Sequence, residues 1–185
     1  MTKFHKDYRV TMKDIKKEGD SILRKQLDPV SLPVSEETKT ELECMMTYLK
    51  NSQDPEIAKK YQLRPGAGLS ANQVGINKSM FVIRYQTEKE ETMELKLINP
   101  KLISHAANII YLPEGEGCLS VNREVSGHVP RYERIKVLAF DTEGEEHTYT
   151  FKGYSSILVQ HEMDHLNGIM FFDRINKERP FLNLQ

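Results

Sequence analysis

The chain has 185 residues, of which 38% are hydrophobic and 29% are charged. This length suits one domain, and the composition is typical of a globular protein and excludes extensive disorder. The 26 basic and 27 acidic residues give a net charge of -1, which offers no global attraction to nucleic acid or to an anionic membrane. We therefore expect one domain over residues 1–185, with neither nucleic acid nor membrane as its main ligand.

The cellular location is predicted from what the sequence lacks. No apolar run approaches the roughly 20 residues of a membrane span. The polar start, MTKFHKDYRVTMKDIKK, lacks the apolar stretch of a signal peptide. We expect a cytoplasmic protein that acts as a monomer. Its two cysteines, Cys44 and Cys118, are too few for a disulfide scaffold and are expected to be free thiols or metal ligands.

Helices are predicted in the first third of the chain. Residues 13–25 predict a turn or two of helix. Ser35 is the expected N-cap of a longer helix, because Ser accepts hydrogen bonds from the first-turn amides. Four apolar residues behind it recur at helical spacing: Leu42, Met45, Met46 and Leu49. Asp54 and Pro55 cap and open a second, short helix to about residue 62, so residues 35–63 are expected to be a helical segment.

The middle of the chain predicts a loop and then strands. Residues 64–75 contain three glycines and a proline, which predicts a structured loop rather than a strand or a long helix. Three strands are predicted after it: residues 80–85, residues 94–98 and residues 101–112. Asn99-Pro100 is expected to end the second of these strands, because proline cannot donate to a strand ladder. The PEGEG segment at 113–117 ends the third, so Cys118 follows a glycine-rich turn.

The last third predicts a hairpin followed by a helix. The hairpin strands are residues 134–140 and 145–151. Residues 152–167 predict a helix with Gly168 as its C′ glycine, followed by a short strand at 169–172 and a charged tail at 173–185. The strands do not alternate strictly with helices. This order favours an α+β fold with mostly antiparallel strands packed around the C-terminal helix.

The sharpest motif lies in that last helix, where His161-Glu162-Met163-Asp164-His165 places two histidines four residues apart. They share one helix face, so both imidazoles can reach one metal ion, and Glu162 can act on a water bound to it. The alternative is a pair of surface histidines on an amphipathic helix. A catalytic metal site usually has a third protein ligand. The residues left open for that role are Cys118, Cys44, His105, His128 and His147.

Three motifs together resemble those of peptide deformylases, in order and in spacing. They are GAGLSANQ at residues 66–73, EGCLS at residues 116–120 and QHEMDH at residues 160–165. The resemblance covers roughly residues 60–172, and the motifs lie in the expected core at 64–172. Residues 35–63 resemble the helical insertion of the type 2, Gram-positive branch. The first motif departs from the family at Ser70-Ala71-Asn72, where many members have Ala-Ala-Pro.

The resemblance implies an enzyme that hydrolyses the N-formyl group from the formyl-methionine of newly made polypeptides and releases formate. It implies Cys118, His161 and His165 as ligands of Fe²⁺, for which Zn, Ni or Co can substitute. Glu162 is the implied acid and base. The Gln73 side chain and the backbone N–H of Leu119 are the implied donors to the tetrahedral oxyanion, which needs such donors besides the metal.

The resemblance also indicates how the substrate is bound. Four residues are expected around the methionine side chain by family position: Gly68, Leu69, Ile157 and His161. Arg131 is counted with the substrate residues; it resembles the family's arginine that pairs with the motif glutamate, here Glu116, and that pair would support the Cys118 loop. The alternative is a surface arginine. The peptide is expected to bind as an added strand through backbone hydrogen bonds. The expected partners are formyl-methionyl nascent peptides, with a transient ribosome contact.

Three alternatives stay open at this point. A zinc endopeptidase would use the same helix, but such enzymes more often complete the site with His or Glu. A metal-stabilised binding module would need a closed site with a fourth ligand such as Cys44. A ribosome-associated factor would need only structural contacts, and the short tail does not obviously supply a docking helix.

Overall fold

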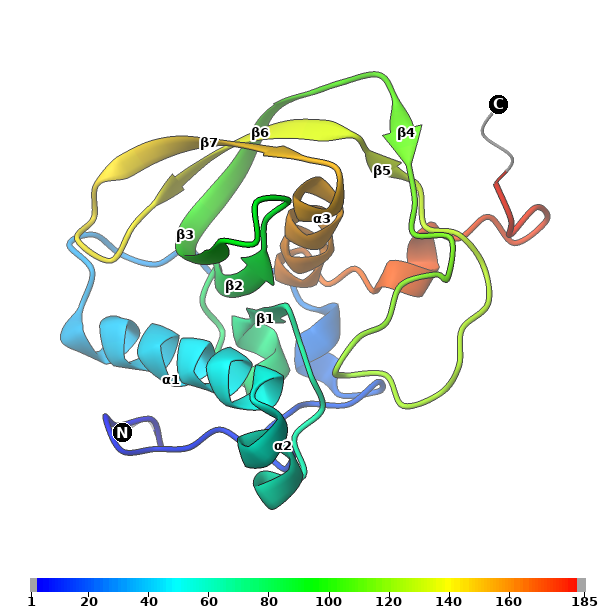
Figure 1. The fold of residues 1–185 in the computed structure, drawn as a ribbon. Helices are drawn as coiled ribbons and strands as arrows, with labels where there is room; N and C mark the ends of the chain where they lie inside the picture. Colours follow the sequence, from blue (N-terminus) through cyan, green and yellow to red (C-terminus); the bar gives the residue numbers. More distant parts are fainter. Residues whose placement is uncertain (1–2, 183–185) are drawn as a thin grey trace.

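The computed structural model describes residues 3–182 (Figure 1). The larger sheet has the strand order β1-β2-β3-β6-β7, and every neighbouring pair is antiparallel. Its strands are β1 (Gly68–Ser70), β2 (Met80–Gln86), β3 (Thr92–His105), β6 (Arg134–Phe140) and β7 (Glu146–Lys152). A small second sheet pairs β4 (Ile109–Ile110) with β5 (Arg131–Tyr132). The predicted α+β fold is confirmed.

The helices are α1 (Glu36–Gln53), α2 (Pro55–Tyr61) and α3 (Tyr154–Leu166), with short 3-10 turns at Ser21–Arg24, Ala71–Val74 and Phe171–Arg174. Both predicted caps are present. The hydroxyl of Ser35 accepts from the amide of Thr38 at 3.2 Å, and Asp54 accepts from the first two amides after Pro55. Within residues 3–182, no helix combines the length and the apolar character that a membrane crossing requires.

The main core is formed by the larger sheet together with α1, α3 and the N-terminal segment. The first four residues of β2 are fully buried, and the predicted apolar face of α1 packs against that strand. Helix α3 contacts β1, β2 and β7, and also β5 of the small sheet (Figure 1). Because α3 is covered from several sides, five of its polar residues are buried and need partners: Ser156, His161, Glu162, Asp164 and His165.

The predicted end of a strand at Asn99-Pro100 is wrong, since β3 continues through both residues. Asn99 adopts a φ of 50°, and the register with β6 shifts between Ile98 and Lys101, so the pair forms an irregularity rather than an end. The Asn99 amide group exchanges two hydrogen bonds of 2.8 Å with the backbone of Val30. These long-range bonds hold the irregular backbone, and proline is tolerated at such a position.

Other local predictions differ in detail. The stretch at 13–25 forms only the 3-10 turn at Ser21–Arg24, and the loop at 64–75 contains β1, whose residues pair with β2. The predicted strand at 169–172 is wrong, because the chain forms the 3-10 turn at Phe171–Arg174 instead. There the Asp173 carboxylate accepts from the Met170 amide at 2.8 Å, a local bond that a strand would not allow. Gly168 has the predicted left-handed conformation, with φ of 70°.

Candidate metal centre and active site

A thiol and two imidazoles meet beside helix α3. The ligand atoms of Cys118, His161 and His165 all lie within 4.8 Å of one another, and Cys118 Sγ is 3.3 Å from His165 Nε2. The two histidines come from one face of α3, as their spacing predicts, and Cys118 comes from the loop that follows β4. One thiolate and two imidazoles suit borderline and soft transition metals such as iron or zinc.

The other four residues considered for metal binding are engaged elsewhere. Cys44 Sγ contacts the carbonyl oxygen of His5 at 3.4 Å, inside the α1 core. His105 stacks on Tyr132, His128 stacks on Tyr111, and His147 is paired with Asp141. Among residues 3–182, only Cys118, His161 and His165 form a group of three or more side chains that could hold a metal ion.

Glu116 orients the first histidine. Its Oε2 lies 2.8 Å from His161 Nδ1, which leaves Nε2 of that ring as the atom with a lone pair for a metal. Burial lowers the pKa of His161, but the neighbouring Cys118 and Glu116 raise it well above its usual value. The same two groups therefore stabilise a positive charge on the His161 ring, and Nε2 offers its lone pair to a metal only once it has lost its proton. Burial lowers the pKa of His165 well below its usual value, so that ring is neutral and able to coordinate.

A buried chain of ion pairs extends from Glu116. Its carboxylate accepts from Arg131 Nε at 2.8 Å and from Nη2 at 2.9 Å, and Arg131 Nη1 donates to Asp164 at 2.5 Å. Arg174 adds two bonds of 2.5 Å to the same aspartate. Burial raises the pKa of Glu116, but the hydrogen bonds and charges of Arg131 and His161 lower it to about 2. Glu116 is therefore ionised when it orients His161.

Glu162 is held by a residue of β1. Its Oε2 accepts from the hydroxyl of Ser70 at 2.7 Å, while its Oε1 has no hydrogen-bond partner among residues 3–182. Only 3% of Glu162 is exposed, and burial raises the pKa of its carboxyl group. A carboxylate with a raised pKa and one free oxygen is suited to take up and release a proton.

Gln73 reaches the same thiol. Its Nε2 donates to Cys118 Sγ at 3.4 Å and to the hydroxyl of Ser120 at 3.1 Å. Its Oε1 accepts from the amide of Ser70 at 2.9 Å, which fixes the orientation of the side-chain amide. The side chain is buried, so the sequence-based alternative of a solvated loop amide does not hold.

A cavity of about 270 Å³ opens onto these groups. Its apolar wall includes Tyr154, Ile157 and Leu158 from α3, and its polar wall includes Gln73 and Glu162. The predicted substrate residues divide here. Gly68, Ile157 and His161 line the cavity, whereas the side chain of Leu69 is fully buried in the core and Arg131 lies in the ion-pair chain.

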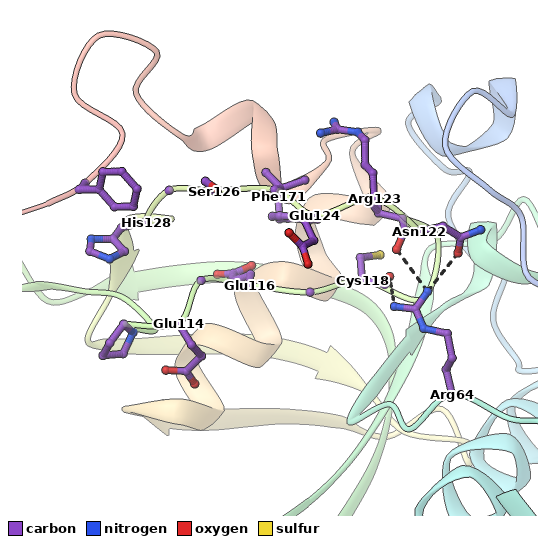
Figure 2. A pocket seen from close by; sticks show the side chains of 17 residues that line it. Arg64, Glu114, Glu116, Cys118, Asn122, Arg123, Glu124, Ser126, His128 and Phe171 are labelled. Carbon is purple, nitrogen blue, oxygen red and sulfur yellow. Dashed lines mark hydrogen bonds between the residues drawn. The ribbon is translucent and has the colours of Figure 1, made fainter. Parts of the chain in front are cut away.

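A second, larger cavity of about 550 Å³ adjoins the first (Figure 2). It is formed mainly by the loop at 113–128, and its lining is largely polar. The two cavities share Arg64 and the segment Glu116, Gly117 and Cys118. The Cys118 segment therefore forms a wall common to both.

Comparison with known proteins decides between the alternatives. Residues 12–181 match the family model described as polypeptide deformylase. The chain belongs to the polypeptide deformylase family. It is 53% identical over 172 residues to peptide deformylase 2 of Bacillus cereus, covering 93% of this chain and 94% of that one. It is also 53% identical over 174 residues to a peptide deformylase of Latilactobacillus sakei, with the same two coverages.

Solved deformylase structures have the same fold. The enzyme from Thermotoga maritima is 33% identical and superposes with a TM-score of 0.69, covering 88% of this chain and 96% of that one. A class I type b enzyme from Acinetobacter baumannii, solved with Met-Ala-Ser bound, is 29% identical with a TM-score of 0.70, covering 87% and 96%. The protein is a metal-dependent hydrolase that removes the N-formyl group from newly synthesised polypeptides.

Sequence reasoning missed two residues that contact the candidate site and its ion-pair chain, Ser70 and Asp164. Ser70 holds Glu162, and Asp164 joins Arg131 to Arg174. An acidic residue inside the histidine motif was a signal for Asp164, because the side chain lies on a buried helix and needs a cation. Ser70 stands within the departure from the family motif, and nothing in its local sequence indicates a carboxylate partner.

Gly68 gives a prediction for the deformylase reaction. A Cβ at this position would lie 2.2 Å from Glu162 Oε1 and 2.6 Å from Cδ, so Gly68→Ala must displace the carboxylate. A displacement on the order of 1 Å costs about 100-fold in rate, and we expect kcat/KM for formate release to fall by about that factor. The matched variant is Gly66→Ala, whose Cβ would lie 3.0 Å from a Leu119 methyl group and no closer than 3.5 Å to the other side-chain atoms of Leu119 and Leu49. Gly66→Ala should lower kcat/KM by less than Gly68→Ala does. Equal losses in the two variants would contradict the prediction.

Proposed function

We propose that Cys118, His161 and His165 hold one Fe²⁺ and that Glu162 carries protons in the hydrolysis of the formyl amide. The observation that carries the proposal is the group of three donor atoms within 4.8 Å of one another, beside a buried carboxylate and a cavity. Structural zinc sites use four protein ligands, and three are found in the part of the chain that the structure describes. Zn, Ni or Co would suit the same donors, so iron is the finer part of the proposal.

The chain's own residues then have separate tasks. When bound, the ion acidifies a water toward neutral pH and polarises the formyl carbonyl. Glu162 Oε1 accepts the proton of the attacking water and passes it to the leaving amine, while Ser70 fixes Oε2. Gln73 Nε2 and the N–H of Leu119 donate to the oxyanion that develops on the formyl group.

The cavity of about 270 Å³ is the proposed site for the methionine side chain. Ile157 supplies apolar surface to it, and Gly68 allows the peptide to approach Glu162. The structure of the Acinetobacter baumannii enzyme with Met-Ala-Ser bound supports a short peptide that begins with methionine as the kind of ligand. The Leu69 side chain packs in the core beneath its own strand, β1, and Arg131 binds Glu116. Neither is proposed to touch the substrate.

The wider assignment follows the sequence predictions. We propose one catalytic domain over residues 1–185, with residues 35–63 as a helical insertion and residues 173–185 as a tail, of which 183–185 lie outside the described residues. We further propose that it acts as a cytoplasmic monomer on formyl-methionyl nascent peptides, with transient ribosome contact. The near-neutral charge supports release from the ribosome rather than permanent binding.

The proposal is tested by formate release from formyl-Met-Ala-Ser, with protein purified without oxygen. We expect release with Fe²⁺, loss on treatment with a chelator, and recovery when Fe²⁺ is added back. Exposure to air should remove activity, because both Fe²⁺ and the Cys118 thiolate can be oxidised. Quantifying the iron bound per chain checks the stoichiometry of one.

Two outcomes would contradict the proposal. Cleavage of internal peptide bonds by the metal-loaded protein, without formate release, would favour an endopeptidase. Binding of metal without any hydrolysis would favour a metal-stabilised module.

A further inference from the structure

Two cations lie against the loop that follows Cys118, and neither has a carboxylate partner in residues 3–182. Arg64 donates to the carbonyl of Cys118 at 3.2 Å, to the carbonyl of Val121 at 3.2 Å and to Asn122 Oδ1 at 3.1 Å. Lys17 donates to the carbonyl of Leu119 at 2.7 Å and to the same Asn122 oxygen at 3.2 Å. Figure 2 shows Arg64 extended toward Cys118 and Asn122. Both cations therefore bind neutral carbonyl oxygens, of the backbone and of the Asn122 side chain, rather than carboxylates.

The Arg64 contact concerns one particular peptide group. The carbonyl of Cys118 and the N–H of Leu119 belong to the same planar trans peptide, so they point in opposite directions. With its carbonyl turned toward Arg64, the group must present the Leu119 N–H away from Arg64. Within the described chain that N–H has no hydrogen-bond partner, and Leu119 lines the smaller cavity.

The Lys17 contact concerns the next peptide group along the chain. Its carbonyl is that of Leu119, which Lys17 binds, and its N–H is that of Ser120, which donates to Cys118 Sγ at 3.4 Å. Consecutive peptide groups thus each have a cation on the carbonyl side. On their amide sides, one N–H is free at the cavity and the other faces the thiol.

We propose that Arg64 and Lys17 are positioning residues that orient and polarise these two peptide groups. Arg64 strengthens the Leu119 N–H as an oxyanion donor, and Lys17 strengthens the Ser120 N–H as a donor to the thiolate. A hydrogen bond to a carbonyl strengthens the N–H of the same amide as a donor, because hydrogen bonds in a chain polarise one another. The inference rests on the proposed roles of Leu119 and Cys118.

The test compares variants that remove one cation each. Arg64→Met should lower kcat for formate release by about tenfold and leave KM within about twofold, as expected for a group that acts through another. Arg64→Lys should recover part of the loss, because it restores a charged donor. Arg123→Gln is the matched control. Arg123 lies on the loop that follows Cys118, but it pairs with Glu18.

A second readout does not depend on activity. The ¹⁵N chemical shift of an amide responds to hydrogen bonding at the preceding carbonyl, and it can be measured in the Zn²⁺-loaded protein. Arg64→Met should move the shift of Leu119, and Lys17→Met should move that of Ser120. Arg123→Gln should move neither.

The outcomes separate this inference from the proposed function. A loss confined to KM, with the Leu119 shift unchanged, would make Arg64 a substrate contact and overturn the inference. Equal effects of Arg64→Met and Arg123→Gln would also overturn it. An inactive but Fe²⁺-loaded wild-type enzyme would instead contradict the proposed function, while the amide shifts would still test the polarisation.

Discussion

Glu162→Gln is expected to lower kcat for formate release by about 100- to 10,000-fold, the range that a positioned acid or base contributes. Glutamine has nearly the same shape, and its side-chain oxygen can still accept from the hydroxyl of Ser70, which binds Glu162 at 2.7 Å. It cannot take up the proton of the attacking water. Steady-state kinetics with formyl-Met-Ala-Ser measures the effect.

The interpretation requires that metal binding and folding persist. Iron content and melting temperature of Glu162→Gln should match those of the wild type, because the metal-binding atoms of Cys118, His161 and His165 are untouched. Ser70→Ala is the comparison variant. It removes the hydrogen bond to the Glu162 carboxylate but keeps the carboxylate, so it should lower kcat by less than Glu162→Gln does. Retention of most activity in Glu162→Gln would exclude Glu162 as the proton carrier.

Arg131→Met is expected to destabilise the fold by about 3–5 kcal/mol, because it leaves the buried carboxylate of Glu116 without its cation, whereas Asp164 keeps Arg174. Arg131 is 2% exposed and bonds both Glu116 and Asp164. Urea unfolding of the metal-free proteins at pH 7 measures the free energy of unfolding. The same variant should bind iron more weakly, because Glu116 no longer holds His161 in place.

The pH dependence of this effect has a defined sign. The folded-state pKa of Glu116 is lowered from 4.5 to about 2, so its stabilising contribution is complete above pH 4.5 and is lost as the pH falls through 2. The difference in the free energy of unfolding between wild type and Arg131→Met should therefore narrow as the pH falls from 4.5 to 2. Arg174→Met is the control: the Arg174 side chain is 41% exposed, and its loss should cost about 1 kcal/mol or less. A difference that widens at low pH would contradict the argument.

Local signals predicted much of the fold. Ser35 and Asp54 cap helices where the sequence indicates, and the two motif histidines share one face of α3 because four residues make about one helical turn. The strand end predicted at Asn99 was wrong, because the bonds from Asn99 to Val30 span 69 positions. Nothing near Asn99 in the sequence indicates that partner.

The candidate site was predicted less evenly, for the same reason. Spacing alone left five residues for the third ligand, and Cys118 stood out through the family resemblance. It lies 47 positions from His165, and Ser70 lies 92 positions from Glu162. Contacts of this kind arise from the folding of the sheet around α3, so they become visible only in three dimensions.

The link between Arg174 and Asp164 has a consequence for how the enzyme is made. Synthesis begins at the N-terminus, so Cys118 is added before either histidine, and the arginine that completes the ion-pair chain comes later still. At about 5–20 residues per second, the stretch from Cys118 to Arg174 takes roughly 3 to 11 s to synthesise. Throughout that time the Cys118 thiol belongs to a chain that still lacks Arg174, the last member of the ion-pair chain. The group of three candidate ligands, Cys118, His161 and His165, is therefore completed only late in the synthesis of each chain.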